Sequence, residues 1–135
     1  MAKSKLSVKE LTKAEEEVMQ ILWQLGKGFV NDLLEQYPEP KPAYNTISTI
    51  IRILEKKGFV AHNSFGKTYE YYPLISKEKY TQQFMGNVVK GYFDNSYKKV
   101  VSFFTGNENL SVNEMEEIRR IIDEQIAQRK ALQNE

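Results

Sequence analysis

The chain has 135 residues, a formal net charge of +1, and a composition that is 41% hydrophobic and 12% aromatic. This length suits one compact domain or two very small ones, and the apolar content excludes a wholly disordered chain. The sequence contains no cysteine, which excludes disulfides, a cysteine-ligated zinc site and a thiol nucleophile. With only one histidine, His62, a histidine-rich metal site is not expected, and a serine–histidine relay would have to depend on that single residue.

Membrane and catalytic signals are missing from the sequence. There is no run of about 18 apolar residues, and residues 1–10 lack the apolar region of a secretory signal. We therefore expect a cytoplasmic protein without membrane insertion. No glycine-rich phosphate loop, nucleophile elbow or metal-ligand spacing occurs, so we expect no catalytic residue, metal or cofactor, and predict that the protein is not an enzyme.

The N-terminal part of the chain predicts a scaffold helix. Thr12 and Glu15 form a capping box, and the helical pattern covers residues 13–25 until Gly26. Trp23 is expected to seal one edge of the core. The basic segment before this helix is interpreted as a solvated tail, with DNA-backbone contacts as the alternative for its lysines. Those lysines are Lys3, Lys5 and Lys9.

A short helix and a proline-rich turn follow. Residues 28–30 are predicted to form a linker or one edge strand, after which Asn31 or Asp32 starts a short helix. Three prolines between residues 38 and 42 prevent this helix from continuing. The order of helix, short helix, turn and next helix is that of a helix-turn-helix whose last helix is presented outward.

Residues 43–58 show the clearest two-faced pattern. An apolar stripe at helical spacing predicts a buried face, made of Ile47, Ile50, Ile51 and Leu54. A polar stripe, rotated away from it, consists of Asn45, Ser48, Thr49, Arg52 and Lys56. Short amides and hydroxyls can reach base edges in a major groove, whereas arginine and lysine reach phosphates. We interpret this stretch as a recognition helix; taken alone, it also fits an ordinary amphipathic surface helix with a solvated polar face.

Positive charge is concentrated in this helix and the segment after it. Between residues 41 and 67 there are five cations and one anion, Glu55, which gives a local net charge of +4. The cations are Lys41, Arg52, Lys56, Lys57 and Lys67. A basic stripe on one face is the electrostatic footprint of nucleic-acid binding. Because the stripe is modest, a dimer that doubles the phosphate contacts is expected to bind more tightly than one copy.

The segment after the helix is predicted to be a β-hairpin. Residues 59–63 and 68–73 are rich in strand-forming residues, and residues 64–67 hold a turn glycine. In the second strand Tyr69 and Tyr71 point to the same side. His62 is interpreted as a strand residue without a catalytic role. A helix-turn-helix followed directly by a hairpin is the winged-helix arrangement, in which the wing tip brings Lys67 near a phosphate.

These features assign the residues expected to contact double-stranded DNA. Base contacts are assigned to Tyr44, Asn45, Ser48 and Thr49. Backbone contacts are assigned to Lys41, Thr46, Arg52, Lys56 and Lys67. An alternative stays open for Arg52, in which it ties the helix to the wing. An alternative function also stays open, a winged-helix protein–protein interaction module that never binds DNA.

The chain changes character after residue 75. Ser76 can cap a helix over residues 77–93, and a second helical segment is predicted over residues 96–104. Ser111 and Glu114 form a capping box at the start of a last helix. About 60 residues in short helices make a unit below the size that usually supports its own core. We therefore predict a winged-helix DNA-binding domain over residues 1–75 and a helical dimerisation domain over residues 76–135. The alternative is that the second unit packs back on the first within one chain.

The predicted fold class is mainly α with a small β-hairpin wing, a winged helix-turn-helix domain followed by a short helical dimerisation domain. A two-fold homodimer would place two recognition helices in successive major grooves. Its interface is assigned to apolar and aromatic residues of the C-terminal helices. These are Tyr80, Phe84, Val88, Tyr97, Val101, Phe104, Met115, Ile118 and Ile122.

Three runs carry a resemblance to a known family: NTI at residues 45–47, RILEKKGFV at 52–60 and GKTYEY at 66–71. They resemble the BlaI/MecI family, the penicillinase and methicillin-resistance repressors of bacteria, and the resemblance covers about residues 11–123. It implies a homodimeric winged-helix repressor of transcription that binds a palindromic operator. One departure is Ala43, where relatives often carry a serine or threonine cap.

Regulation is implied only by this resemblance. In the antibiotic-responsive members, the dimerisation domain is cut at an Asn–Phe bond after a membrane sensor protease detects a β-lactam. The matching stretch here has no asparagine before either phenylalanine, so the candidate cleavage residues are Ser102, Phe103 and Phe104. The copper-responsive relatives use cysteines, and this chain has none, which excludes copper sensing of that kind.

Overall fold

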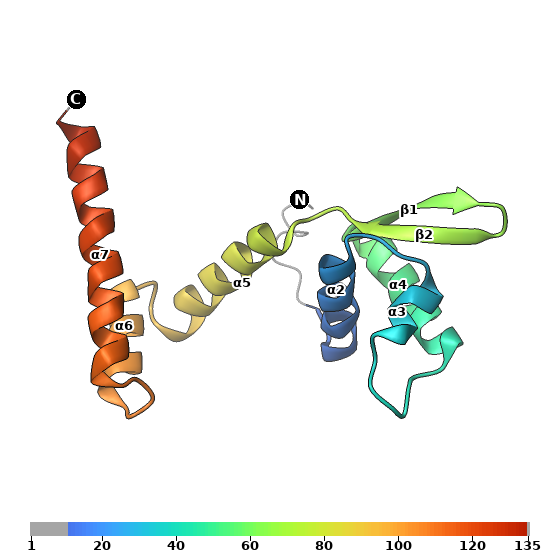
Figure 1. Ribbon diagram of the computed structural model, residues 1–135, viewed down its shortest axis with the longest axis horizontal. Helices are drawn as coiled ribbons and strands as arrows, with labels where there is room; N and C mark the ends of the chain where they lie inside the picture. Colours follow the sequence, from blue (N-terminus) through green and yellow to red (C-terminus); the bar gives the residue numbers. More distant parts are fainter. Residues whose placement is uncertain (1–10, 135) are drawn as a thin grey trace. The chain divides into compact units, whose positions relative to one another are not determined.

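The computed structural model of the chain describes residues 11–134. Its first part contains helices α2 (Lys13–Leu25), α3 (Val30–Glu35) and α4 (Tyr44–Lys57) and strands β1 (Val60–Phe65) and β2 (Thr68–Pro73). Helices α5 (Lys77–Tyr92), α6 (Tyr97–Gly106) and α7 (Val112–Gln133) follow (Figure 1). The fold is mainly α with one small hairpin, as predicted. The expectation for Lys3, Lys5 and Lys9 lies outside the described residues.

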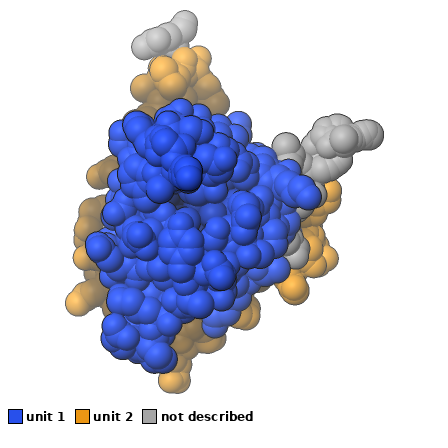
Figure 2. Space-filling view, turned by 90° about the vertical axis from the view of Figure 1, so that its right-hand side faces the viewer, with its two compact units in different colours: residues 1–87 blue, residues 88–135 orange. Residues whose placement is uncertain are grey.

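The chain divides into two compact units, Met1–Asn87 and Val88–Glu135 (Figure 2). The predicted domains divide earlier, after residue 75. The first turns of α5 account for the difference, because the ring of Tyr80 lies 5.7 Å from that of Trp23 and 6.0 Å from that of Phe59. Tyr80 is 9% exposed. The structure thus places Tyr80 in the core of the first unit, whereas the sequence assigned it to the dimer interface.

The core of the first unit lies between its helices and the hairpin. Helix α4 packs against α2, α3 and β1, and β2 packs against α2 and α3. Figure 1 shows the hairpin as an arm beside α3 and α4. Each fully buried large aliphatic side chain contributes about 1.5–3 kcal/mol to folding. The core residues are Val18, Met19, Leu22, Val30, Leu33, Ile47, Ile51, Leu54, Phe59, Val60, Tyr71 and Tyr80.

Helix α2 begins and ends where the sequence predicts. The Thr12 hydroxyl accepts a hydrogen bond from the Glu15 N–H at 3.1 Å, and the Glu15 carboxylate accepts one from the Thr12 N–H at 3.0 Å. Gly26 follows the last turn with a φ of 87°, a conformation that favours glycine. Trp23 packs against the core edge as expected, and its Nε1 donates to the Ile75 carbonyl oxygen at 2.9 Å.

Helix α3 begins one residue earlier than the sequence predicts. The Asp32 carboxylate accepts a hydrogen bond from the Phe29 N–H at 2.9 Å, so Phe29 is the N-cap and Val30 the first helical residue. Strand pairing before α3 is limited to Gly28, which exchanges two backbone hydrogen bonds with Tyr71. The expected edge strand is therefore reduced to a single bridge, because the residues after Gly28 belong to the helix.

Strand β2 has the predicted bounds, whereas β1 ends two residues later than predicted. They pair antiparallel up to Phe65 opposite Thr68, which leaves Gly66 and Lys67 as a two-residue turn. Gly66 has a φ of 64°, a conformation that such turns require and that glycine adopts without strain. Ser64 and Phe65, which the sequence assigned to the turn, therefore extend β1.

The second unit contains the end of α5, α6 and α7. Ser96 caps α6 by accepting a hydrogen bond from the Lys99 N–H at 3.1 Å. Ser111 and Glu114 form the predicted capping box of α7. Helix α6 runs to Gly106, beyond its predicted end at residue 104. Among the described residues of this unit Val89 alone has a buried side chain, so the unit leaves most of its apolar groups accessible.

Candidate nucleic-acid interface

The buried face of α4 fixes which of its side chains point outward. Ile47, Ile51 and Leu54 are buried in the core, and Ile50 is partly buried against it. The predicted polar stripe therefore lies on the accessible side of the helix. Its residues Asn45, Thr49, Arg52 and Lys56 are exposed, and Ser48 is half-buried. Tyr44 and Thr46, which also have predicted DNA contacts, are exposed on the first turn of the helix.

The two ends of α4 are capped differently. Ala43 is the N-cap, with extended backbone and no side-chain hydrogen bond to the first turn. The first amides of the helix therefore lack a side-chain acceptor, and the helix dipole favours an anion at this end. At the other end Gly58 has a left-handed φ of 90°, and Lys56 and Lys57 complement the dipole.

A groove of about 460 Å³ lies between α4 and the hairpin. It brings the outward face of the recognition helix together with the wing tip, two regions that are separate in the sequence. Arg52 and Lys67 contribute cations to its walls, and Asp32 contributes one anion. The other lining residues are Phe29, Val30, Asn31, Tyr44, Ser48, Thr68, Tyr69 and Tyr71. Asn31, Thr68 and Tyr69 were absent from the predicted contact set, because only the packing of α3 and the hairpin brings them to this groove.

The remaining predicted contacts lie outside this groove. Thr49 and Lys56 line a second, shallower hollow on α4, together with Arg52, Ile53 and Glu55. Asn45 and Thr46 line neither hollow, and both are exposed on the first turns of α4. Arg52 borders both hollows.

Lys41 has a structural role that the sequence did not indicate. Its ammonium group donates hydrogen bonds to the carbonyl oxygens of Leu34 at 3.2 Å, Glu35 at 3.3 Å and Tyr37 at 2.6 Å. These are the last carbonyls around the end of α3, where a cation complements the helix dipole. The ammonium group is thus occupied by the fold, which argues against its predicted contact with phosphate.

Lys57 forms an ion pair that sequence reasoning missed. Its ammonium group lies 2.8 Å from Oε1 and 3.0 Å from Oε2 of Glu15, whose side chain is 7% exposed. Burial by itself raises the pKa of the Glu15 carboxyl. Hydrogen bonds from the Lys57 ammonium and the Thr12 N–H outweigh burial and hold that pKa below its ordinary value. Lys57 therefore contributes to stability, and its charge is not free for DNA.

Glu55 makes a polar side-chain contact between α4 and the wing. Its Oε2 lies 2.7 Å from Nδ1 of His62 on β1. Arg52 donates instead to the Ser48 carbonyl oxygen within α4, at 3.3 Å, so the structure does not favour the alternative in which Arg52 ties the helix to the wing. Burial and the nearby Glu55 carboxylate raise the pKa of the Tyr71 hydroxyl, which borders the same region.

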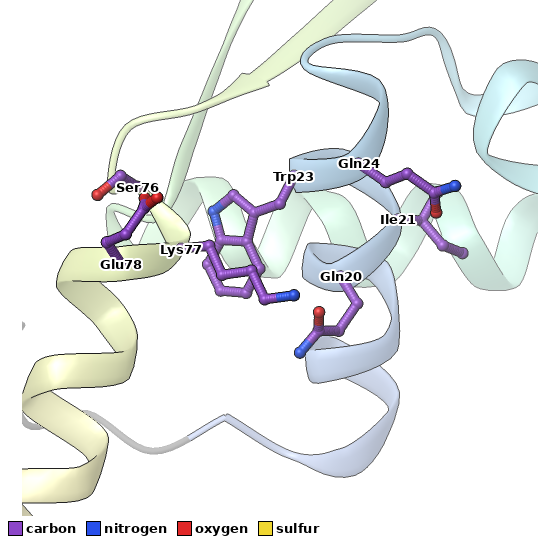
Figure 3. A pocket seen from close by; sticks show the side chains of 7 residues that line it. All are labelled: Gln20, Ile21, Trp23, Gln24, Ser76, Lys77 and Glu78. Carbon is purple, nitrogen blue, oxygen red and sulfur yellow. The ribbon is translucent and has the colours of Figure 1, made fainter. Parts of the chain in front are cut away.

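A hollow of about 660 Å³ lies away from these residues, between α2 and the start of α5 (Figure 3). Figure 3 shows Trp23 of α2 and Lys77 of α5 among the residues that line it. The Trp23 Nε1 and the Ser76 hydroxyl oxygen are both engaged in hydrogen bonds of the fold. The other lining residues are Gln20, Ile21, Gln24 and Glu78. None of the residues predicted to contact DNA lines this hollow.

Residues 11–134 contain no cluster of three or more metal-ligating side chains. Within the same range no helix is long and apolar enough to cross a membrane.

Comparison with known proteins identifies the family to which this chain belongs. A sequence profile of the family described as Penicillinase repressor matches residues 11–124. The chain belongs to the penicillinase repressor family. The methicillin resistance regulatory protein MecI of Staphylococcus aureus (strain N315) is 34% identical over 119 residues, which cover 84% of this chain and 94% of that protein. The penicillinase repressor of Bacillus licheniformis is 25% identical over 118 residues, which cover 87% of this chain and 92% of that protein.

A solved structure is also similar, the solution structure of the DNA binding domain of the repressor BlaI. It is 26% identical, has a TM-score of 0.47, and is matched over 53% of this chain and 89% of that chain. Membership of the penicillinase repressor family confirms the resemblance carried by the three runs. The chain is therefore a DNA-binding repressor of transcription and not an enzyme.

In this member of the penicillinase repressor family, the residues assigned to a dimer interface are mostly accessible in the single chain. Tyr97, Val101 and Phe104 on α6 and Ile118 and Ile122 on α7 are exposed. Phe84, Val88 and Met115 are exposed or half-buried, and Tyr80 is the exception already described. Further apolar residues of these helices are exposed but were not assigned to the interface: Tyr92, Phe103, Val112, Ile121, Ile126 and Leu132.

Proposed function

We propose that the chain is a homodimeric winged-helix repressor that binds a palindromic double-stranded operator through α4 and the wing. The observation that carries the proposal is the groove between α4 and the hairpin. One face of α4 is buried in the core, and the opposite face shares a groove with the wing-tip cation Lys67. Helix-turn-helix proteins present a recognition helix to the major groove in this way.

The chemistry of the outward face supports separate roles along α4. Tyr44, Asn45, Ser48 and Thr49 carry hydroxyl and amide groups on the first turns, which suit hydrogen bonds to base edges. Arg52 and Lys56 follow toward the C-terminal end and suit phosphates. The Thr46 N–H donates to the Ala43 carbonyl oxygen at 3.1 Å, so the phosphate contact of Thr46 is proposed through its exposed side-chain hydroxyl.

The wing supplies the second set of phosphate contacts. Lys67 sits in the hairpin turn, and Thr68 and Tyr69 add hydroxyl groups on the same wall of the groove. A DNA backbone strand lying in this groove would meet Lys67 from the wing and Arg52 from α4. Asp32 borders the groove and disfavours a phosphate at its α3 side, which directs the strand toward the two cations.

The homodimer is supported by the second unit. Among its described residues Val89 alone has a buried apolar side chain, whereas Phe104 on α6 and Ile122 on α7 are more than 40% exposed. Exposed apolar surface of this kind marks protein–protein contacts. A two-fold dimer would present two copies of α4 to half-sites spaced by about one turn of DNA, 34–36 Å, or a multiple of it.

Release of the operator by cleavage is proposed on the family resemblance alone, with a membrane sensor protease as the partner. The candidate residues Ser102, Phe103 and Phe104 are exposed but lie within α6. Helical backbone would have to unwind before a protease could bind it in an extended form. Incubation with a cognate sensor protease and mass spectrometry of the fragments would test this; an intact 96–106 segment in every fragment would contradict it.

Selection of bound duplexes from a random-sequence library, with the purified full chain, tests the main proposal. We expect enrichment of a palindrome whose half-sites are spaced by turns of the double helix, and binding that weakens as salt rises. Recovery of a single half-site would contradict the dimer. No enrichment at low salt would contradict DNA binding and favour the alternative, a winged-helix module that binds another protein.

A further inference from the structure

His62 connects the recognition helix to the wing through a single polar contact. It lies on β1, and its Nδ1 is 2.7 Å from Oε2 of Glu55 on α4. A carboxylate only accepts hydrogen bonds, so Nδ1 carries the hydrogen, either in the neutral ring or in the imidazolium. The side chains of His62 and Glu55 are 26% and 32% exposed, so the pair is partly shielded from water and still open to protons.

The imidazole also supports a wall of the groove. The ring of Tyr69 stacks on it with centroids 3.9 Å apart and planes 11° apart. The ring of Tyr71 meets it at 5.5 Å with an interplanar angle of 63°. Tyr69 and Tyr71 both line the groove with Arg52 and Lys67. The imidazole of His62 thus packs against Tyr69 and Tyr71, the two tyrosines that form the wall of the groove facing DNA in the proposed complex.

The charges around His62 come from α4 and β2. Glu55 is the anion in contact with it, and Arg52 and Lys56 share the same hollow of α4 as Glu55. From β2 the phenols of Tyr69 and Tyr71 face the imidazole. Glu70 is the one acidic residue of β2, and it lies on the opposite side of the hairpin because side chains alternate along a strand.

We infer that His62 is a positioning residue for operator binding, and that its protonation tightens binding by pairing with Glu55 and holding Tyr69 and the wing against α4. The inference rests on the proposed function. The imidazolium neutralises the Glu55 carboxylate, an acidic group on a face that has to approach phosphates. DNA phosphates favour the charged imidazole in return, so proton uptake and operator binding reinforce each other.

The direction and size of the effect follow from this linkage. We expect affinity to rise as the pH falls through the near-neutral range in which imidazole side chains in general gain a proton. One linked proton changes affinity by at most about tenfold per pH unit, and a dimer has two such protons. Above this range the neutral ring keeps the hydrogen bond but leaves the Glu55 charge in place.

The test measures the Kd of the full chain for a fluorescent palindromic duplex recovered by selection, at constant ionic strength, between about pH 5.5 and 8.5. We expect the wild-type Kd to fall with pH. His62→Gln should bind at a level independent of pH, near the weak wild-type level at high pH. His62→Lys keeps a permanent cation opposite Glu55, so it should restore tight binding at all pH values. Circular dichroism of each variant checks that it is folded.

Lys67→Ala is the matched control, because it removes a cation from the same groove without touching the imidazole. It should weaken binding at every pH by a similar factor and keep the wild-type pH dependence. The inference is overturned if the wild type shows no pH dependence, or if His62→Gln retains it. Failure of the wild type to bind any selected duplex would overturn the proposed function as well.

A second measurement needs no substitution. His62 is the one histidine of the sequence, so its imidazole resonances can be followed without ambiguity by NMR. We expect the midpoint of its titration to move to higher pH when the selected duplex is added, and to move less with a scrambled duplex of equal length. An unchanged midpoint in the complex would overturn the inference.

Discussion

The ammonium group of Lys57 lies 2.8 Å from Oε1 of Glu15, which joins the end of α4 to the first turn of α2. The neighbouring Lys56 is exposed and forms no ion pair among the described residues. The adjacent residues Lys56 and Lys57 of α4 therefore have different roles. Lys57 fixes the helix to the scaffold, whereas Lys56 leaves its charge accessible to DNA in the proposed complex.

Substitution of these two lysines should separate stability from binding. Lys57→Ala leaves the Glu15 carboxylate without its partner, and we expect a loss of about 1–3 kcal/mol in the free energy of unfolding, less than for a fully buried pair. Lys56→Ala should change the free energy of unfolding by less than about 0.5 kcal/mol and weaken DNA binding. Urea unfolding and fluorescence anisotropy with the selected duplex measure the two effects. Equal stability of the two variants would contradict the role of Lys57.

The same pair predicts a pH dependence of stability. The pKa of Glu15 is lowered in the folded state, so its contribution is present above the unfolded-state pKa of about 4.3 and is lost as pH falls through the lower folded value. Glu15→Gln keeps an acceptor for the Thr12 N–H but removes the charge. We expect it to be less stable than the wild type at neutral pH, with the difference shrinking in acid. Urea unfolding at several pH values measures this, and a constant difference would contradict the assignment.

Substitutions on the first turns of α4 should change sequence preference. Asn45→Ala or Ser48→Ala removes a group proposed to reach base edges, and each good contact is worth about 1–3 kcal/mol of discrimination. Binding to the selected palindrome should weaken, while binding to a scrambled duplex should stay similar. Gln20→Ala, an exposed amide on α2, is the control and should leave both affinities unchanged. Equal losses on both duplexes would point to a backbone contact instead.

Lys67→Ala at the wing tip should weaken binding to every sequence. Removing one phosphate contact per protomer lowers the magnitude of the salt slope by about 1 for each copy bound. The slope of the logarithm of affinity against the logarithm of salt concentration, measured for the selected palindrome and a scrambled duplex, checks this. A loss confined to the palindrome would mean that Lys67 contacts a base.

Tyr80 and Ile122 should respond differently although both were assigned to the dimer interface. Tyr80→Ala removes a core side chain of the first unit, and we expect a loss of about 2–4 kcal/mol in its stability. Ile122→Asp introduces a charge on an exposed apolar face of α7, so it should dissociate the proposed dimer in sedimentation equilibrium. Asp123→Asn, at the neighbouring exposed position, is the control. Dimers of Ile122→Asp as stable as the wild type would exclude this face from the interface.

The sequence by itself determined the features that depend on near neighbours in the chain. The capping boxes at Thr12 and Ser111, the two-faced pattern of α4 and the turn glycine Gly66 involve residues a few positions apart, so their interactions can be inferred from spacing. The same local runs carried the family resemblance, and with it the class of the protein. These features were enough to predict a winged helix-turn-helix followed by a helical unit.

Only the tertiary structure decided which polar side chains are free to contact DNA. Lys57 pairs with Glu15 across 42 positions of sequence, the Lys41 ammonium is held by the carbonyls at the end of α3, and Glu55 reaches His62 on the wing. Tyr80 likewise became part of the core through contacts with Trp23 and Phe59. Such pairings depend on how helices and strands pack together, and the spacing of residues along one helix contains no information about the element that lies against it.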